Sequence, residues 1–436
     1  MVKGTPTHPA PLTKAEAEAY FSAYTDFTKG NDWLTKEKST NAYVQYDHAF
    51  NTSIPMNISV GLRRESTPVD SSSQVVALTG AVWSALNEIQ VQTGSQTFGS
   101  GSGKYAYTLP SIDWDADLTS DLKLRASYGE NIGRPGWGSL TGGVSVGSTA
   151  NAGGGTGSTG NPALKPLLSK NFDTSLEFYY AKSSYLAAGL FQKKITNFVS
   201  TTDVMMPVGG VHTPIGGKYY NAAKAACGNV DPKCLRNYIF TNFVGQPGVT
   251  VTGPANAAGE IQGLIAAQPD DPLLQFKVST PANAAGDNLK GFELNAQHVF
   301  GNSGFGVAGN YTFVKSGLKF DNSSAASQSA LVGVGNSYNL VGFYENSAWS
   351  TRVAYNRRDK FLASTSDGAG NNPIYTAPYG QVDLSVGYKW GKNLTLQADF
   401  INLSDGVIRQ YGRTKEELIS VIQTGRRYQV GARYRF

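Results

Sequence analysis

The sequence is short of charge and contains no long apolar run. Only 16% of its residues are Asp, Glu, Lys or Arg, whereas ordinary soluble domains have roughly 25%. Mean hydropathy is −0.27, and no stretch approaches the roughly 18–20 apolar residues that a membrane helix needs. Membrane helices are therefore excluded within this sequence. A membrane β-barrel remains compatible, because its alternating strands conceal their hydrophobicity from a window average. A large soluble β protein fits these numbers as well.

Residues suited to catalysis and to metal binding are also scarce. The four histidines, His8, His48, His212 and His298, are scattered, and no Ser–His–Asp spacing or phosphate-binding loop is present. Asp113, Asp115 and Asp117 alternate in one segment. They could act as acid and base or bind Ca²⁺, but an acidic strip facing a polar lumen is the better interpretation. We therefore predict no enzyme activity, no cofactor and no metal site.

Basic tracts are absent too. Net charge is only +5 with a pI near 8.9, so nucleic acid is not an expected partner. Cys227 and Cys234 are the only cysteines. They can close a short loop as a disulfide in an oxidising compartment, and the alternative is two free thiols.

The last twelve residues, 425–436, alternate strictly between two kinds of side chain. One face carries Tyr428, Val430, Ala432, Tyr434 and Phe436, and the other carries Arg427, Gln429, Gly431, Arg433 and Arg435. Alternation with period two indicates a strand between unlike environments. Three arginines are too many for a packed core, so a strand with lipid outside and water inside is favoured. The edge strand of a soluble sandwich is the alternative.

Short and long connections alternate along the chain, which favours the barrel. The predicted strands are 41–50, 57–65, 104–118, 122–130, 169–181, 184–200, 288–300, 304–316, 334–346, 349–361, 376–390, 393–402 and 425–436. Every second connection is short, as outer-membrane barrels have short periplasmic turns and long extracellular loops. This pattern requires 66–103 to be one hairpin standing above the membrane and 142–160 to be loop. It also makes 201–284 a very long extracellular loop.

The predicted fold is therefore an all-β, antiparallel transmembrane β-barrel with about 13 strands. Bacterial single-chain barrels have even strand numbers, and this count places 1–40 outside the cell as a loop remnant. We therefore expect N-terminal strands to be missing and the outer edge of the last strand to be open, or to be closed only by a strained pairing with 41–50. Residues 13–24 are expected to form a short helix with a capping box.

Two internal segments and the C-terminus resemble TonB-dependent receptors. The segments are Ser127–Gly136 (SYGENIGRPG) and 160–173, which contains GNPALKP followed by SKNFD, and the closing sections are Asn402–Asp405 (NLSD) and 425–436. The similarity extends from about residue 41 to the end. Leu167 and Leu168 stand where the family usually has an acidic residue.

The resemblance implies a 22-stranded barrel with a plugged lumen in the bacterial outer membrane. Such receptors import scarce ligands, here of carbohydrate or iron-siderophore type, with energy relayed by TonB. The plug and TonB box are not visible in this sequence, so 41–436 is expected to be the C-terminal part of such a barrel, unable by itself to transport actively. A passive porin or structural barrel is the alternative function, and a barrel enzyme is less favoured.

Ligand contacts are expected from aromatic side chains of the outer loops, because aromatic planes stack on sugars and on siderophore rings. The candidates are Trp33, Trp137, Tyr219, Tyr220, Tyr238 and Phe361. The resemblance further implies outer-membrane lipid, the TonB complex, the barrel-assembly machinery and a small-molecule ligand as partners. Tyr434 and Phe436 would form the C-terminal barrel-assembly signal.

Overall fold

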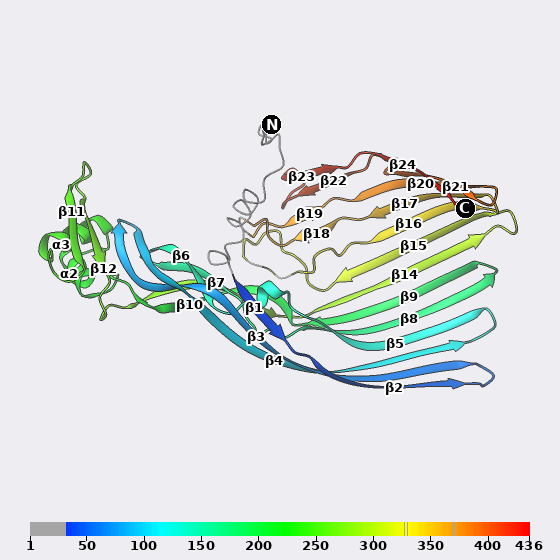
Figure 1. The fold of residues 1–436 in the computed structure, drawn as a ribbon, viewed down its shortest axis with the longest axis horizontal. Helices are drawn as coiled ribbons and strands as arrows, with labels where there is room; N and C mark the ends of the chain where they lie inside the picture. The colour runs from blue at the N-terminus through cyan, green and yellow to red at the C-terminus, as the bar shows by residue number, and fades with distance from the viewer. Residues whose placement is uncertain (1–31, 327, 329, 369–370) are drawn as a thin grey trace.

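The structure is a computed structural model that describes residues 32–326, 328, 330–368 and 371–436. One curved antiparallel sheet forms an open trough, and a long arm extends from one end of it (Figure 1). The strands of this wall are, in order, β2 (Thr40–Phe50), β3 (Met56–Ala85), β4 (Glu88–Asp117), β5 (Leu122–Gly133), β8 (Leu167–Ala181), β9 (Ser184–Thr196), β14 (Asp287–Val299), β15 (Phe305–Ser316), β16 (Ser337–Glu345), β17 (Trp349–Arg358), β20 (Tyr379–Trp390), β21 (Leu394–Ile401) and β24 (Arg427–Tyr434). Each is hydrogen-bonded antiparallel to the next. The predicted antiparallel β architecture is confirmed.

Cross-strand register keeps the two faces of the wall distinct. Val430 of β24 pairs with Ala398 of β21, and Gln429 pairs with Asp399. Apolar side chains thus lie opposite apolar ones, and polar side chains lie opposite polar ones. A one-residue shift in register would move every side chain to the other face, so this register is what keeps the two faces distinct. The alternation that predicts the last strand therefore persists in three dimensions.

The short turns all lie at the end of the trough that also holds the C-terminus (Figure 1). They span 51–55, 118–121, 182–183, 300–304, 346–348 and 391–393. Left-handed backbone helps to close them, with φ of +54° at Gly301 and +64° at Gly391, where glycine has no Cβ to clash. The long connections lie at the opposite end, so the predicted alternation is confirmed.

The hairpin predicted above the membrane is present but is longer and more regular than expected. β3 and β4 each contain 30 residues and stay paired from Met56 with Ala116 to Ala85 with Glu88. The Gly/Ser-rich residues 94–103 belong to β4. Their small side chains permit close packing, since a Cβ on Gly99 or Gly103 would meet backbone atoms at 2.4 Å and 2.2 Å.

One loop expectation and one strand boundary were wrong. Residues 142–160 form a hairpin, β6 (Val144–Asn151) and β7 (Gly154–Thr159), and β7 also pairs in parallel with β13 (Leu273–Ala284). The strand expected over 184–200 breaks at Asn197, which has φ of +61°. Pairing with distant segments thus gives strand structure to a glycine-rich segment whose own β-strand propensity is low.

The segment 201–284, predicted as a very long loop, contains strands and helices. β10 (Phe198–His212) pairs with β13, and β11 (Val249–Ala255) pairs with β12 (Ile261–Ala266). Two helices, α2 (Lys218–Cys227) and α3 (Pro232–Asn242), lie at the far end of the arm. No helix of the described residues is long and apolar enough to cross a membrane.

The two edges of the wall are unpaired with each other. No pairing between β2 and β24 occurs in the part of the chain that the structure describes, which agrees with the expected open edge. β1 (Trp33–Glu37) pairs with the upper part of β3. The helix predicted for 13–24 and most of 1–40 lie outside the described residues.

Candidate ligand-binding surface

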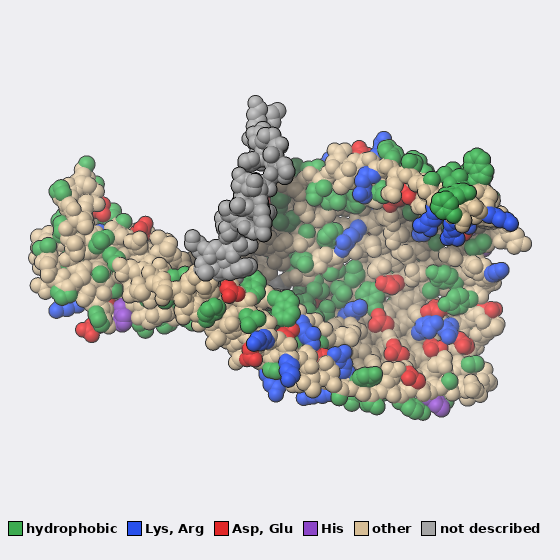
Figure 2. All heavy atoms as spheres, viewed as in Figure 1, with side chains coloured by type: hydrophobic (Ala, Val, Ile, Leu, Met, Phe, Trp, Pro, Cys, Tyr) green, Lys and Arg blue, Asp and Glu red, His purple; other side chains and the backbone are tan. Residues whose placement is uncertain are grey.

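The hollow face of the trough is lined by charged side chains from adjacent strands, and Figure 2 shows acidic and basic groups along it. A pocket of about 300 Å³ opens there between β4, β5, β8, β9 and β14. Its charged lining residues are Asp113, Asp115, Arg125, Asp173 and Glu293. The sequence predicts a polar lumen wall, and this charged face is the candidate for it.

Ion pairs between neighbouring strands neutralise much of this wall. Lys123 Nζ lies 3.0 Å from Asp115 and 3.2 Å from Asp117. Arg125 Nε lies 3.0 Å from Glu177. Asp115 and Asp117 therefore share Lys123 of β5 as a basic partner, and the acidic strip stays a predicted lumen feature. Within the described residues, no group of three or more His, Cys, Asp or Glu could hold a metal ion.

A second pocket, of about 380 Å³, lies nearer to the long-loop end of the same face. Its centre is Glu65, which is only 2% exposed and pairs with both Arg63 and Arg134. Arg134 also donates to the hydroxyl of Tyr105 at 2.9 Å. Glu130 also lines the pocket but is paired with Lys170, so the two guanidinium groups around Glu65 leave one excess positive charge. Guanidinium binds carboxylate or similar planar oxygen pairs in a bidentate manner.

The arm has a small hydrophobic core of its own. The core contains Trp83 and Ile89 from the β3–β4 hairpin, Ile239 and Phe240 from α3, and Phe276 from β13, all buried. Segments far apart in the sequence thus bury one another at the tip. The arm is therefore a folded subdomain rather than a set of separate loops.

Arg236 connects the helices to the hairpin. Its guanidinium is almost fully buried and donates to the carbonyl oxygens of Trp83, Ser84 and Gly263 at 2.6, 3.1 and 2.8 Å. It also lies 5.4 Å from the Trp83 ring centre and 5.1 Å from that of Phe240. Burial lowers the pKa of Arg236 from its ordinary value, but the cation is retained by these carbonyl and aromatic partners.

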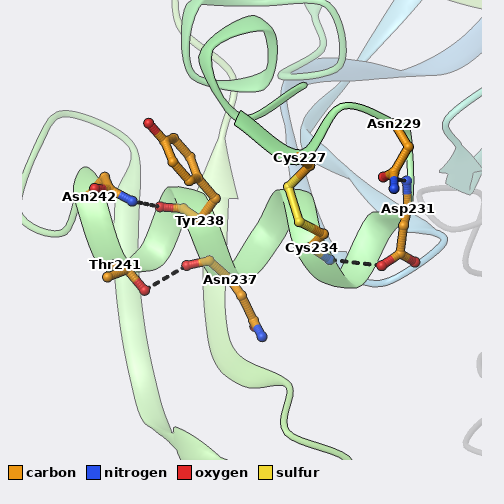
Figure 3. The surroundings of a disulfide bond; sticks show 8 residues. All are labelled: Cys227, Asn229, Asp231, Cys234, Asn237, Tyr238, Thr241 and Asn242. Carbon is orange, nitrogen blue, oxygen red and sulfur yellow. Dashed lines mark hydrogen bonds between the residues drawn. A yellow bond between two sulfur atoms is a disulfide. The ribbon is translucent and has the colours of Figure 1, made fainter. Parts of the chain in front are cut away.

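The two cysteines link the helices of the arm (Figure 3). Cys227 ends α2 and Cys234 lies in the first turn of α3, with an S–S distance of 2.03 Å and Cα atoms 6.1 Å apart. Asp231 caps α3 by accepting from the backbone N–H of Cys234 at 3.1 Å. The structure thus pairs these cysteines as a disulfide, in preference to two free thiols.

A second group of long connections forms a four-stranded sheet above the other side of the trough. Its strands are β18 (Phe361–Ser364), β19 (Ile374–Thr376), β22 (Val407–Tyr411) and β23 (Leu418–Gln423). Arg413 holds three connections together by donating to the Asn371 carbonyl at 3.0 Å, to the Asn372 side chain at 3.2 Å and to the Asn322 carbonyl. The rings of Tyr375 and Tyr411 stack 5.7 Å apart, and burial raises the pKa of both.

The predicted ligand-contacting aromatics do not form one cluster. Tyr219, Tyr220 and Tyr238 pack against the core of the arm, and the rings of Tyr219 and Tyr238 lie 4.8 and 6.2 Å from that of Phe243. Trp33 and Trp137 are half exposed on β1 and on the 3-10 helix η1 (Trp137–Leu140). Their role in ligand binding stays a prediction.

Phe361 lies in the second sheet, with Arg358 4.0 Å above its ring. Sequence reasoning did not identify Arg236, Arg413 or the group around Glu65. Arg134 lies within the Gly-Arg-Pro-Gly segment that carries the resemblance, and this position was the one sequence signal for the group around Glu65. No local pattern distinguishes Arg236 from a solvated helix residue.

The comparisons with known proteins define the class. The family model "TonB dependent receptor-like, beta-barrel" matches residues 13–403. The chain therefore belongs to the TonB-dependent receptor β-barrel family. No curated protein matches the sequence.

Solved structures agree in fold. The siderophore receptor PirA from Acinetobacter baumannii is 12% identical with a TM-score of 0.50, over 92% of this chain and 55% of that one. A mutant of the ferric enterobactin receptor PfeA from Pseudomonas aeruginosa is also 12% identical with a TM-score of 0.50, over 92% and 54%. At this identity the likeness shows the fold alone. The chain spans about half the length of these proteins.

Proposed function

We propose that this chain forms the C-terminal barrel wall and the ligand-capturing outer surface of a TonB-dependent outer-membrane receptor. The observation that carries the proposal is the polarity of the wall. It has one apolar face, one charged hollow face, short turns at one end and folded connections at the other. Lipid outside and an aqueous lumen inside account for both faces. The short-turn end is then periplasmic, and the arm and the second loop sheet stand outside the cell.

The ligand we propose is an anionic iron chelate of siderophore type rather than a neutral sugar. The positive pocket around Glu65 supports this choice, because Arg63 is half exposed there and retains donors for a ligand. The names of the structural neighbours, a siderophore receptor and a ferric enterobactin receptor, favour the same ligand class. Energy for uptake would come from the TonB complex, and Tyr434 with Phe436 would be read by the barrel-assembly machinery.

Uptake by cells tests this function. Cells with the gene at its native locus should accumulate a labelled ferric catecholate under iron limitation, and deletion of this gene or of the TonB gene should abolish the accumulation. A labelled maltodextrin should enter equally in all strains. Uptake that persists without TonB would support a passive porin instead, and maltodextrin uptake lost with the gene would support a carbohydrate receptor.

The adjacent residues Arg63 and Arg64 provide a test variant and a matched control for the ligand site. Arg63 faces the positive pocket, whereas Arg64 lies on the opposite face of β3 and donates to Thr108 at 2.8 Å. Arg63→Gln should weaken binding of the ferric catecholate about tenfold, as expected for one charge-assisted hydrogen bond. Arg64→Gln should leave the affinity unchanged. Equal losses in both variants would contradict the proposed pocket.

A further inference from the structure

Four lysines gather on the apolar face of the wall, at the long-loop ends of four consecutive strands. They are Lys170 of β8, Lys194 of β9, Lys290 of β14 and Lys315 of β15. All four side chains are exposed. They share a face with the apolar residues because Lys170 and Leu176, and Lys290 and Leu294, are separated by even numbers of residues along their strands.

The strand register places these charges directly against one another. Lys170 is the cross-strand partner of Lys194, and Lys290 is the partner of Lys315. Like charges directly opposite in an antiparallel ladder are destabilising. Glu130 pairs with Lys170 at 3.0 Å, but among the described residues Lys194, Lys290 and Lys315 form no ion pair. The cluster therefore has an excess of positive charge that an external anion would neutralise.

An apolar groove lies below the cluster on the same strands. Its volume is about 690 Å³. Its large apolar lining residues are Leu176, Phe178, Leu186, Leu294, Tyr311, Tyr338 and Leu340. The phenyl rings of Phe292 and Phe313 stack 5.3 Å apart between the lysines and this groove. Charge above an apolar groove is the complement of a lipid with an anionic headgroup.

The height of the cluster matches the boundary of a bilayer. His298 is eight residues from Lys290 along β14 and accepts or donates a hydrogen bond with the Tyr180 hydroxyl at 2.9 Å. This polar aromatic pair stands at the short-turn end, where an interfacial girdle is expected. Eight residues span about 27 Å along the strand, which at the usual tilt of roughly 35–45° is about 20 Å across the membrane, near the roughly 25 Å apolar band of outer-membrane barrels. The lysines thus lie at headgroup level on the opposite side.

We propose that Lys170, Lys194, Lys290 and Lys315 form a binding site for a lipid with a phosphorylated headgroup. The phosphate oxygens accept from the lysine ammonium groups, and an acyl chain occupies the groove between Leu176 and Leu340. The site depends on the apolar face being the lipid face, as in the proposed function. It does not depend on which ligand enters the lumen.

Lipid titration of the full chain in a zwitterionic detergent tests this site, with bound lipid counted by native mass spectrometry. Phosphatidic acid, phosphatidylcholine with the same acyl chains, and inorganic phosphate are the three probes. Phosphatidic acid should bind at least tenfold more tightly than phosphatidylcholine, and added salt should weaken it. Inorganic phosphate that competes at equal concentration would reveal a free-anion site and overturn the lipid proposal, as would equal binding of both lipids.

The variant Lys194→Gln/Lys290→Gln/Lys315→Gln removes the unpaired charges. Each lysine near an anionic lipid contributes roughly fivefold, so affinity for phosphatidic acid should fall on the order of 100-fold. Lys193→Gln is the matched control, because Lys193 is adjacent to Lys194 but lies on the hollow face of β9. A loss with Lys193→Gln as large as with the triple variant would overturn the proposal. If the triple variant fails to fold, the lipid preference of the unaltered protein remains decisive.

If the lumen binds a different ligand than proposed above, the lipid result is unaffected. Conversely, cells could take up ferric catecholate while the protein binds phosphatidic acid and phosphatidylcholine equally. That result would contradict the lipid site and leave the receptor function intact. The two proposals therefore fail separately.

Discussion

The wall and the arm are built from the same strand pairing but are stabilised in different ways. Large apolar side chains of the wall, such as Leu190, Leu340 and Val430, are exposed, and its buried core is minimal. The arm instead encloses Trp83, Phe240 and other fully buried residues and carries a disulfide. The difference indicates that the wall relies on its surroundings to cover its apolar face, whereas the arm buries its own, as a water-soluble domain does.

Replacing Arg236 should have the largest effect on the stability of the arm relative to that of the wall. Arg236→Met leaves the carbonyls of Trp83, Ser84 and Gly263 without their donor, and each buried acceptor left unsatisfied costs about 1–3 kcal/mol. Hydrogen exchange should speed up across α3 and β12 while the wall strands stay protected. Lys224→Met, at an exposed position of α2, is the control and should have little effect. Loss of protection throughout the wall would show that the arm is not independent.

Adjacent residues of β14 test the two faces of the wall. Leu294 lies in the apolar groove and is 47% exposed, and Asn295 points to the opposite face. Leu294→Lys should destabilise the protein in lipid vesicles by about 2–4 kcal/mol, as for a lysine at the bilayer midplane, whereas Asn295→Lys should cost much less. Denaturant titration measures both. Equal costs would contradict the assignment of lipid and water to these faces.

The disulfide should affect the arm alone. Its cysteines are only seven residues apart, so Cys227→Ser/Cys234→Ser should lower the stability of the arm by about 2 kcal/mol through the small loop entropy involved. Limited proteolysis should cut the α2–α3 connection sooner, and reduction of the unaltered protein should have the same effect. A wall that becomes protease-sensitive in this variant would argue against separate stabilisation.

The smallest expected effect is a pH dependence of the stability of the second loop sheet. Burial raises the pKa of Tyr375 and Tyr411, so the folded sheet holds protons that the unfolded segment has already lost above the ordinary tyrosine pKa of about 10. Its stability is full below that pH and falls as pH rises towards the raised pKa values. Hydrogen exchange of β19 and β22, corrected for its intrinsic rate, should report the loosening. The decrease of stability with pH should be smaller in Tyr375→Phe/Tyr411→Phe. An unchanged decrease in this variant would contradict the tyrosines as its cause.

Prediction from sequence was accurate where side-chain period decides the structure. The strands 41–50, 288–300, 304–316 and 393–402 agree with β2, β14, β15 and β21 to within one residue at each end. His298, which interrupts an otherwise apolar face, proves to bond with Tyr180 at the short-turn end. Prediction failed for 142–160, and it gave no internal structure for 201–284, because these segments lack alternation and become ordered only through distant partners.

The sequence by itself determined the two-faced strands, their direction and the alternation of short and long connections, since each follows from local side-chain period and turn residues. Tertiary structure alone decided that the long connections fold into an arm, that Arg236 is buried against the β3–β4 hairpin and that lysines from four strands meet. These features depend on register between segments up to about 150 residues apart, such as Arg236 and Trp83. Side-chain period within one strand carries no information about such register.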